Sequence, residues 1–283
     1  MDSLRTRVAV LAQNLIYWGT PLVAFLLVTL FYLRTYDSAM IKITAAQLGI
    51  AALVACWVIK AIETGRLECP VPIAKILWPA ALLILWTVLS YGLSPYKIAS
   101  LYGFVRFLLC LLIFCIGLLE FSQLSTAKRL IDWILAATWV AAIYGLIQWF
   151  DYRWFANDAM SRGIDPFIWS RAFGYRVFST LGNPDLLAAL LVGAYPLAAT
   201  SFLSSFPGRG AATLPIQEGP WYQKLFRPVG SLRLVLASLL MPLLIFNLIY
   251  TWSMKGLVAF IPTMLLFAFL SFKFLLTRIQ GEI

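Results

Sequence analysis

The chain has 283 residues, of which 62% are apolar and only 12% are charged, and its mean hydropathy is +0.87. A soluble domain carries roughly a quarter charged residues, so this composition excludes a chain that covers itself with polar surface in water. The net charge of +10 does not indicate nucleic acid, because the basic residues are scattered between apolar stretches. We therefore expect an integral membrane protein that contacts membrane lipids and no nucleic acid.

About eight stretches of the chain are long and apolar enough to cross a hydrocarbon core as helices. In chain order they are Leu15–Leu33, Ile43–Ile59, Ile76–Tyr91, Ile98–Leu119, Leu130–Phe150, Pro184–Phe202, Leu234–Thr251 and Leu257–Leu276. This pattern predicts an all-α, polytopic membrane helical bundle. The chain shows no repeat of fixed period, and we expect residues 1–283 to form a single transmembrane domain.

The distribution of basic residues predicts that both termini are cytoplasmic. With the N-terminus inside, most of the 22 lysines and arginines fall in cytoplasmic segments. The opposite side then holds the smaller set Arg34, Lys42, Lys97, Arg153, Arg162, Arg171, Arg176 and Lys255. In this orientation residues 205–232 form a cytoplasmic loop, which Pro207 and Gly208 keep from being helical.

Residues 151–182 form the predicted external loop, in which arginines alternate with aromatic residues. One interpretation is an interfacial segment, with Trp and Tyr at the depth of the lipid headgroups and Arg on lipid phosphate. The other is an anion site, because guanidinium groups make paired hydrogen bonds to phosphate oxygens. Both interpretations are compatible with the same loop.

The segment that follows this loop favours the anion site. Asn183 is a preferred N-cap residue, Pro184 suits the first position of a helix, and Gly182 permits a tight turn before the cap. Free N–H groups and the positive end of the helix dipole would then face the loop arginines, which suits a pyrophosphate. The Asp185 carboxylate competes with a ligand for the same N–H donors, which weakens the prediction of an anion site. The alternative interpretation is an ordinary capped helix. The predicted pyrophosphate-binding residues here are Arg153, Arg162, Arg171, Arg176 and Asn183.

Two further cations complete the predicted site. Arg106 lies inside the fourth span, where a charge costs at least a few kcal/mol and usually faces the bundle interior or water. Lys255 lies in a short external turn between the last two spans, where it meets an anion or ends a helix. The other polar residues in or near the spans, Gln47, Gln148 and Asn247, are expected to join helices by hydrogen bonds.

The residue types present give no catalytic residue and no metal or cofactor site. The chain contains no histidine and 4 cysteines, of which Cys69 falls in a predicted cytoplasmic loop and the rest in apolar spans. Zinc binding requires clustered cysteine or histidine, so we expect no metal ion. General base catalysis by a histidine of these 283 residues is therefore excluded.

Residues 176–188 resemble a segment of the O-antigen ligase and polymerase superfamily. In that superfamily a pattern R-V-x-x-x-L-G-N-P-N-x-x-A opens a helix after an external loop; here Arg176-Val177 is followed by Leu181-Gly182-Asn183-Pro184-Asp185 and Ala188. The later stretch from Thr251 to Gly256 resembles the superfamily's T-x-S-R/K-G turn, with one additional residue. The resemblance extends over the N-terminal two-thirds of such a protein.

The resemblance implies a protein of the bacterial inner membrane that takes a glycan from an undecaprenyl pyrophosphate carrier at the periplasmic face. External arginines, Arg176 first among them, would hold the pyrophosphate and stabilise its charge as it leaves. Superfamily members have further spans and a later external loop whose histidine activates the acceptor. If the polypeptide ends at Ile283, we expect it not to complete the transfer alone.

Three functions therefore remain open from the sequence. The first is an enzyme, or the carrier-binding part of one, that acts on lipid-linked glycans. The second is a non-catalytic membrane subunit of a larger complex, derived from the same superfamily. The third is a transporter of small anions, for which the sequence shows neither inverted repeats nor clearly interrupted helices.

Overall fold

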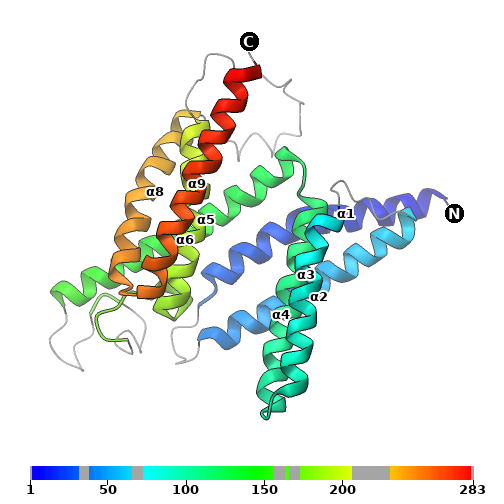
Figure 1. Ribbon diagram of the computed structural model, residues 1–283, viewed down its shortest axis with the longest axis horizontal. Coiled ribbons are helices and arrows are strands. Elements are labelled where there is room, and N and C mark those ends of the chain that lie inside the picture. Colours follow the sequence, from blue (N-terminus) through cyan, green and yellow to red (C-terminus); the bar gives the residue numbers. More distant parts are fainter. Residues whose placement is uncertain are drawn as a thin grey trace. The chain divides into compact units, whose positions relative to one another are not determined.

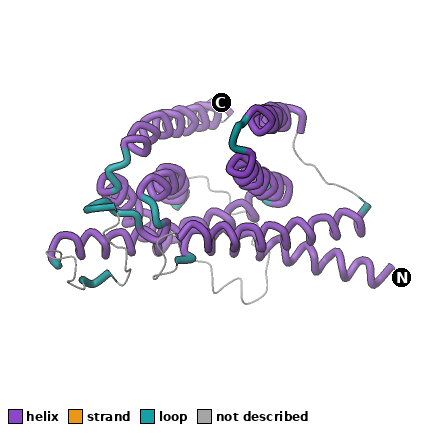
Figure 2. The backbone as a smooth tube through the Cα atoms, turned by 90° about the horizontal axis from the view of Figure 1, so that it is seen from below, coloured by secondary structure: helices purple, strands orange, loops and turns teal. Residues whose placement is uncertain are grey.

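A computed structural model describes residues 2–31, 38–65, 73–155, 163–165, 173–205 and 230–281. These residues form eight α-helices and one short 3₁₀ helix, and Figure 2 shows no strand among them. In chain order the helices are α1 (Asp2–Thr29), α2 (Ser38–Thr64), α3 (Ile73–Leu93), α4 (Lys97–Glu120), α5 (Leu124–Trp154), η1 (Ser179–Leu181), α6 (Pro184–Ser204), α8 (Gly230–Tyr250) and α9 (Met254–Gly281).

Six of these helices (α1, α2, α4, α5, α6 and α9) are long and apolar enough to cross a membrane. The remaining two contain shorter apolar stretches, Trp78–Leu93 in α3 and Leu234–Tyr250 in α8. The prediction of an all-α, polytopic membrane bundle is therefore confirmed. The chain is a multi-pass membrane protein whose apolar helices contact lipid.

Most helices begin before and end after the predicted spans, and α1 begins at Asp2 rather than at Leu15. Helix α1 ends at Thr29 rather than at Leu33, and Lys42 of α2 donates hydrogen bonds to its last carbonyl groups: Nζ lies 2.8 Å from Leu27 O and 3.0 Å from Val28 O. Helix α5 continues to Trp154, four residues beyond the predicted span. The first residues assigned to the external loop are therefore the last turn of a helix. The predicted loop 205–232 lies almost wholly outside the described residues.

The described residues form two compact units. The first contains residues 1–30 and 40–134, and the second contains residues 31–39 and 135–283, so that α5 contributes to both. In the first unit the buried core is formed by Ile16 of α1, Leu53 of α2 and Ile116 of α4. In the same unit α3 and α4 pack as neighbours (Figure 1).

Glu120 connects three helices of the first unit through polar contacts. Its carboxylate lies 2.7 Å from Lys60 Nζ of α2 and accepts a hydrogen bond of 3.2 Å from Gln13 Nε2 of α1. The Glu120 side chain is only 8% exposed. A buried charge of this kind depends on its partner, because removing either one leaves the other uncompensated.

In the second unit α6 packs against both α8 and α9 (Figure 1). Their contact is built from fully buried apolar residues, among them Leu187 and Leu191 of α6 and Leu240 and Leu244 of α8. Asn247 of α8 is also fully buried, and its Nδ2 donates hydrogen bonds to Leu243 O in α8 and, at 3.1 Å, to Ala142 O in α5. The structure thus agrees with the prediction that Asn247 joins helices.

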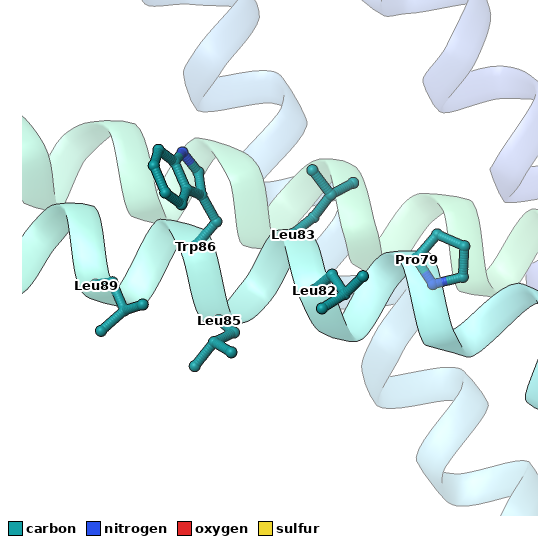
Figure 3. Close-up of a pocket in the computed structure, with 6 residues that line it drawn as sticks. All are labelled: Pro79, Leu82, Leu83, Leu85, Trp86 and Leu89. Carbon is teal, nitrogen blue, oxygen red and sulfur yellow. The ribbon is translucent and has the colours of Figure 1, made fainter.

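The outer surface of the first unit is strongly apolar. Figure 3 shows a hollow on this surface whose lining residues all belong to α3: Pro79, Leu82, Leu83, Leu85, Trp86 and Leu89. Trp86 is 70% exposed and Leu83 is 56% exposed. An exposed apolar surface of this extent is expected where lipid tails replace water as the solvent.

Replacement of Glu120 by alanine is expected to destabilise the first unit by about 3–5 kcal/mol, because it leaves the Lys60 ammonium group without its counter-charge. The measurement is reversible unfolding in detergent micelles. The double replacement Lys60→Met with Glu120→Leu removes both charges and is expected to recover much of the lost stability. Equal losses for Glu120→Ala and the double variant would show that the ion pair does not account for the effect.

Candidate functional site

The start of α6 has the capped geometry that its sequence predicts. Asn183 is the N-cap residue, and its side-chain oxygen accepts a hydrogen bond of 2.8 Å from the backbone N–H of Asp185. Pro184 occupies the first helical position, and Gly182 has a φ of 68°, which favours glycine. The helix therefore begins abruptly, with Asp185 in its first turn.

The turn between α8 and α9 is fixed by two small buried residues. Thr251 is fully buried, and its hydroxyl donates to Leu248 O at 2.7 Å. Ser253 caps α9, because its side-chain oxygen accepts a hydrogen bond from Gly256 N and its carbonyl accepts one from Leu257 N. Lys255 consequently lies in the first turn of α9 and not, as predicted, in a non-helical turn.

Gly256 allows the N-terminal parts of α6 and α9 to lie close together. A Cβ atom at this position would lie 2.5 Å from the Cβ of Ala188, which is closer than two non-bonded carbon atoms can approach. A larger residue would therefore push α9 away from α6. The pair of small residues, Ala188 and Gly256, sets the distance at which side chains on the two helix starts can meet.

Four residues form what we name the cation cluster: Arg176, Asn183, Asp185 and Lys255. Arg176 Nε donates a hydrogen bond of 2.8 Å to Thr251 O, and Arg176 Nη2 lies 3.1 Å from Asp185 Oδ1. Lys255 Nζ lies 3.4 Å from the other carboxylate oxygen, Oδ2. The cluster therefore connects the segment before α6, the first turn of α6 and the first turn of α9.

The cation cluster is accessible and carries a net positive charge. The side chains of Arg176, Asp185 and Lys255 are 37%, 42% and 87% exposed. Two cations and one carboxylate leave one unit of positive charge beside the N-terminus of a 21-residue helix. Because the contacts above use only some of the N–H groups of Arg176 and Lys255, both can also donate to an anion such as a phosphate.

A buried hydrogen-bond network lies on the other side of the Arg176 segment. Gln148 of α5 is fully buried, and its Oε1 accepts hydrogen bonds from the backbone N–H groups of Phe178 at 3.2 Å and Ser179 at 2.7 Å. Its Nε2 donates to Asp165 at 3.2 Å, and the Tyr144 hydroxyl donates to the same carboxylate at 2.6 Å. Gln148 thereby holds the backbone that follows Arg176.

Asp151 fixes the described part of the loop that lies between α5 and Arg176. It is 1% exposed, and its Oδ1 accepts hydrogen bonds from the backbone N–H groups of Ile164 and Asp165. Asp151 lies on α5 three residues beyond Gln148. The last two turns of α5 therefore anchor the loop at two separate points of the chain, residues 164–165 and residues 178–179.

Two non-glycine residues of the described chain have a positive φ, and both flank the cation cluster. Ser179 has a φ of 52° and Trp252 has a φ of 51°. Such a conformation costs of order 1–3 kcal/mol and persists only where the surroundings hold it. Buried contacts hold Ser179: Gln148 accepts from its N–H, and its hydroxyl donates to Ala141 O. In the segment before Ser179, Val177 N donates to Tyr250 O at 2.9 Å.

The structure brings together three of the residues predicted to bind pyrophosphate, namely Arg176, Asn183 and Lys255. Arg153 lies in the last turn of α5 and is exposed. Arg162 and Arg171 lie outside the described residues. Arg106 is an exposed residue of α4, in the first unit.

Sequence reasoning did not find the residues that hold the site in place. Gln148 was expected to join helices, whereas it binds the backbone of the Arg176 segment. Gln47, which was expected to do the same, is exposed. Asp151 and Asp165 were assigned only to the loop, and only Asp151 carried a signal, as a carboxylate next to an apolar span. Among the described residues no group of three metal-binding side chains occurs.

Replacement of Gln148 by leucine is expected to lower the stability of the protein by about 2–4 kcal/mol, because two buried backbone N–H groups lose their acceptor. Unfolding in detergent micelles measures the loss. Gln47→Leu is the matched control, since Gln47 is exposed, and it is expected to change stability little. Equal losses in both variants would contradict the anchoring role of Gln148.

Comparisons with protein-family models, curated proteins and solved structures find no match to this chain. The features of the chain that bear on its function are the cation cluster and the membrane-spanning helices.

Proposed function

We propose that this chain is an O-antigen ligase-like membrane protein that binds an undecaprenyl pyrophosphate-linked glycan. The observation that carries the proposal is the meeting of Arg176 and Lys255 at one carboxylate, although Lys255 and Asp185 are 70 residues apart in the chain. Two cations of different geometry beside a capped helix start suit a pyrophosphate, which presents two phosphate groups to one site.

The position of the cluster suits a ligand that is part lipid and part charged. Asp185 belongs to the first turn of an apolar helix long enough to span a membrane, so the cluster lies at one end of a candidate span. Tyr175 and Trp252, next to the cluster in the chain, are both 69% exposed. Aromatic residues of this kind favour the depth of the lipid headgroups, where a pyrophosphate attached to a polyprenyl chain would also lie.

We place the cluster at the periplasmic face of the bacterial inner membrane, with both termini in the cytoplasm. The excess of basic residues in the segments then assigned to the cytoplasm supports this orientation. In this arrangement a carrier lipid whose glycan faces the periplasm reaches Arg176 and Lys255 from the membrane. The role of the two cations is to hold the pyrophosphate and to stabilise its charge when the glycan leaves.

Arg106 favours a second candidate, a membrane subunit of a larger complex. This arginine is exposed on α4, near the middle of a candidate span, and it has no ion pair with another described residue. A charge at such a depth costs a few kcal/mol unless a polar group or water meets it. A neighbouring subunit with a carboxylate in its own span would supply that group.

Replacement of Arg176 by alanine is expected to abolish retention of the carrier lipid, because it removes the planar donor group that binds phosphate and its link to Thr251 O. The measurement is native mass spectrometry of lipids that co-purify from a bacterial membrane containing undecaprenyl pyrophosphate-linked glycan. Lys273→Ala is the control, since this exposed lysine lies near the other end of α9.

Arg176→Lys is expected to retain the lipid partly, because it keeps the charge and loses the paired hydrogen bonds. The proposal is wrong if the wild-type protein carries no pyrophosphate lipid, or if Arg176→Ala carries as much as Lys273→Ala. Co-purification of another membrane protein with wild type but not with Arg106→Leu, together with an absence of bound pyrophosphate lipid, would favour the subunit candidate.

A further inference from the structure

We propose that Asp185 is the internal counter-ion of the cation cluster and that a phosphate group of the ligand displaces it. Asp185 would then set the affinity of the site, because a ligand must carry more charge than the carboxylate to displace it. This inference rests on the proposed function, since it assumes that the cluster binds a pyrophosphate.

The first argument is the way in which the carboxylate divides its contacts. Asp185 Oδ1 lies 3.1 Å from Arg176 Nη2, and Asp185 Oδ2 lies 3.4 Å from Lys255 Nζ. Each oxygen thus meets one cation, as two oxygens of a bound phosphate would. The carboxylate occupies the position in which a ligand anion would be expected to bind.

Arg176 and the backbone of Lys255 are held by contacts that do not involve Asp185. Arg176 Nε donates to Thr251 O, and Thr251 is fully buried, so the guanidinium group keeps one fixed contact when the carboxylate leaves. Lys255 is placed by the start of α9, which Ser253 caps. Displacement of the carboxylate therefore leaves both cations near the site and frees their N–H groups for a ligand.

The third argument is that the contacts are weak enough to be exchanged. The Asp185 side chain is 42% exposed and that of Lys255 is 87% exposed, so water screens their interaction. The backbone N–H of Asp185 is bonded to Asn183 Oδ1, which keeps the helix cap intact when the side chain rotates. Exchange of the carboxylate for a phosphate does not require α6 to unfold.

Charge then explains why a phosphate displaces the carboxylate. The two cations and Asp185 sum to one positive charge, so an anion that replaces the carboxylate gains by the charge it carries beyond that of the carboxylate. A phosphate monoester carries about 1.5 to 2 negative charges at pH 7 and a pyrophosphate monoester carries more, so both gain and the pyrophosphate gains more. Removing the carboxylate's charge should therefore strengthen the binding of both anions.

The experiment is a calorimetric titration of the purified full chain in detergent micelles with farnesyl pyrophosphate and, separately, with farnesyl monophosphate. Asp185→Asn is expected to tighten binding of the pyrophosphate about three- to tenfold, as expected for one unit charge close to the ligand near a protein surface. Binding of the monophosphate is expected to tighten in the same variant. Asp185→Glu, which keeps the charge, is expected to bind like wild type.

Thermal unfolding is measured on the same samples, and Asp185→Ser serves as a second uncharged variant if Asp185→Asn is unstable. Tighter binding by an uncharged variant that unfolds like wild type supports the inference. Equal or weaker binding by the uncharged variants, with wild type still binding and Arg176→Ala not binding, overturns the counter-ion role and leaves the proposed function standing. Failure of wild type and every variant to bind either probe overturns both proposals.

Discussion

The contacts of Arg176 with Thr251 O and Asp185 hold together the polar end of the second unit. Thr251 lies between α8 and α9, and Asp185 lies in the first turn of α6, so one guanidinium group connects three helices at one end. The close approach of Ala188 and Gly256 allows this, because only a glycine at the start of α9 lets the two helix starts come so near. A membrane helix must satisfy its terminal polar groups within the protein or at the lipid surface, and here an arginine and two caps do so.

This arrangement explains why the site is accessible and yet fixed in geometry. The outer part of the cluster, with Lys255 at its edge, faces solvent and is available to an anion. On its inner side, Gln148 and Asp151 of α5 bind the backbone of the loop through buried hydrogen bonds. Ser179 keeps a left-handed conformation because these contacts outweigh its cost. A site for a charged headgroup therefore rests on an interior network that the ligand itself does not need to touch.

The apolar stretches and the α6 cap could be predicted from the sequence because each depends on local information. The length and hydropathy of a span are properties of one segment, and Asn183-Pro184 is a cap signal that needs no distant partner. The roles of Gln148 and Lys42 could not be predicted in this way. Both side chains bind backbone groups outside their own helix, and Gln148 binds the N–H of Ser179, 31 residues away. The sequence of a single span does not indicate which carbonyl or N–H group its polar side chain will contact. Lys255 was expected either beside an anion or at a helix end, and the sequence did not show that it pairs with Asp185 of the chain itself.

The central claim is that the starts of α6 and α9 meet at the surface of the membrane from which a lipid-linked glycan is bound. The most direct test uses a variant that lacks the 4 native cysteines and carries a single cysteine at position 255. Whole bacterial cells with a permeabilised outer membrane are treated with a maleimide that does not cross the inner membrane. The account predicts rapid labelling at position 255 before the inner membrane is broken. Labelling that appears only after the inner membrane is permeabilised would place the cluster on the cytoplasmic side and contradict the account.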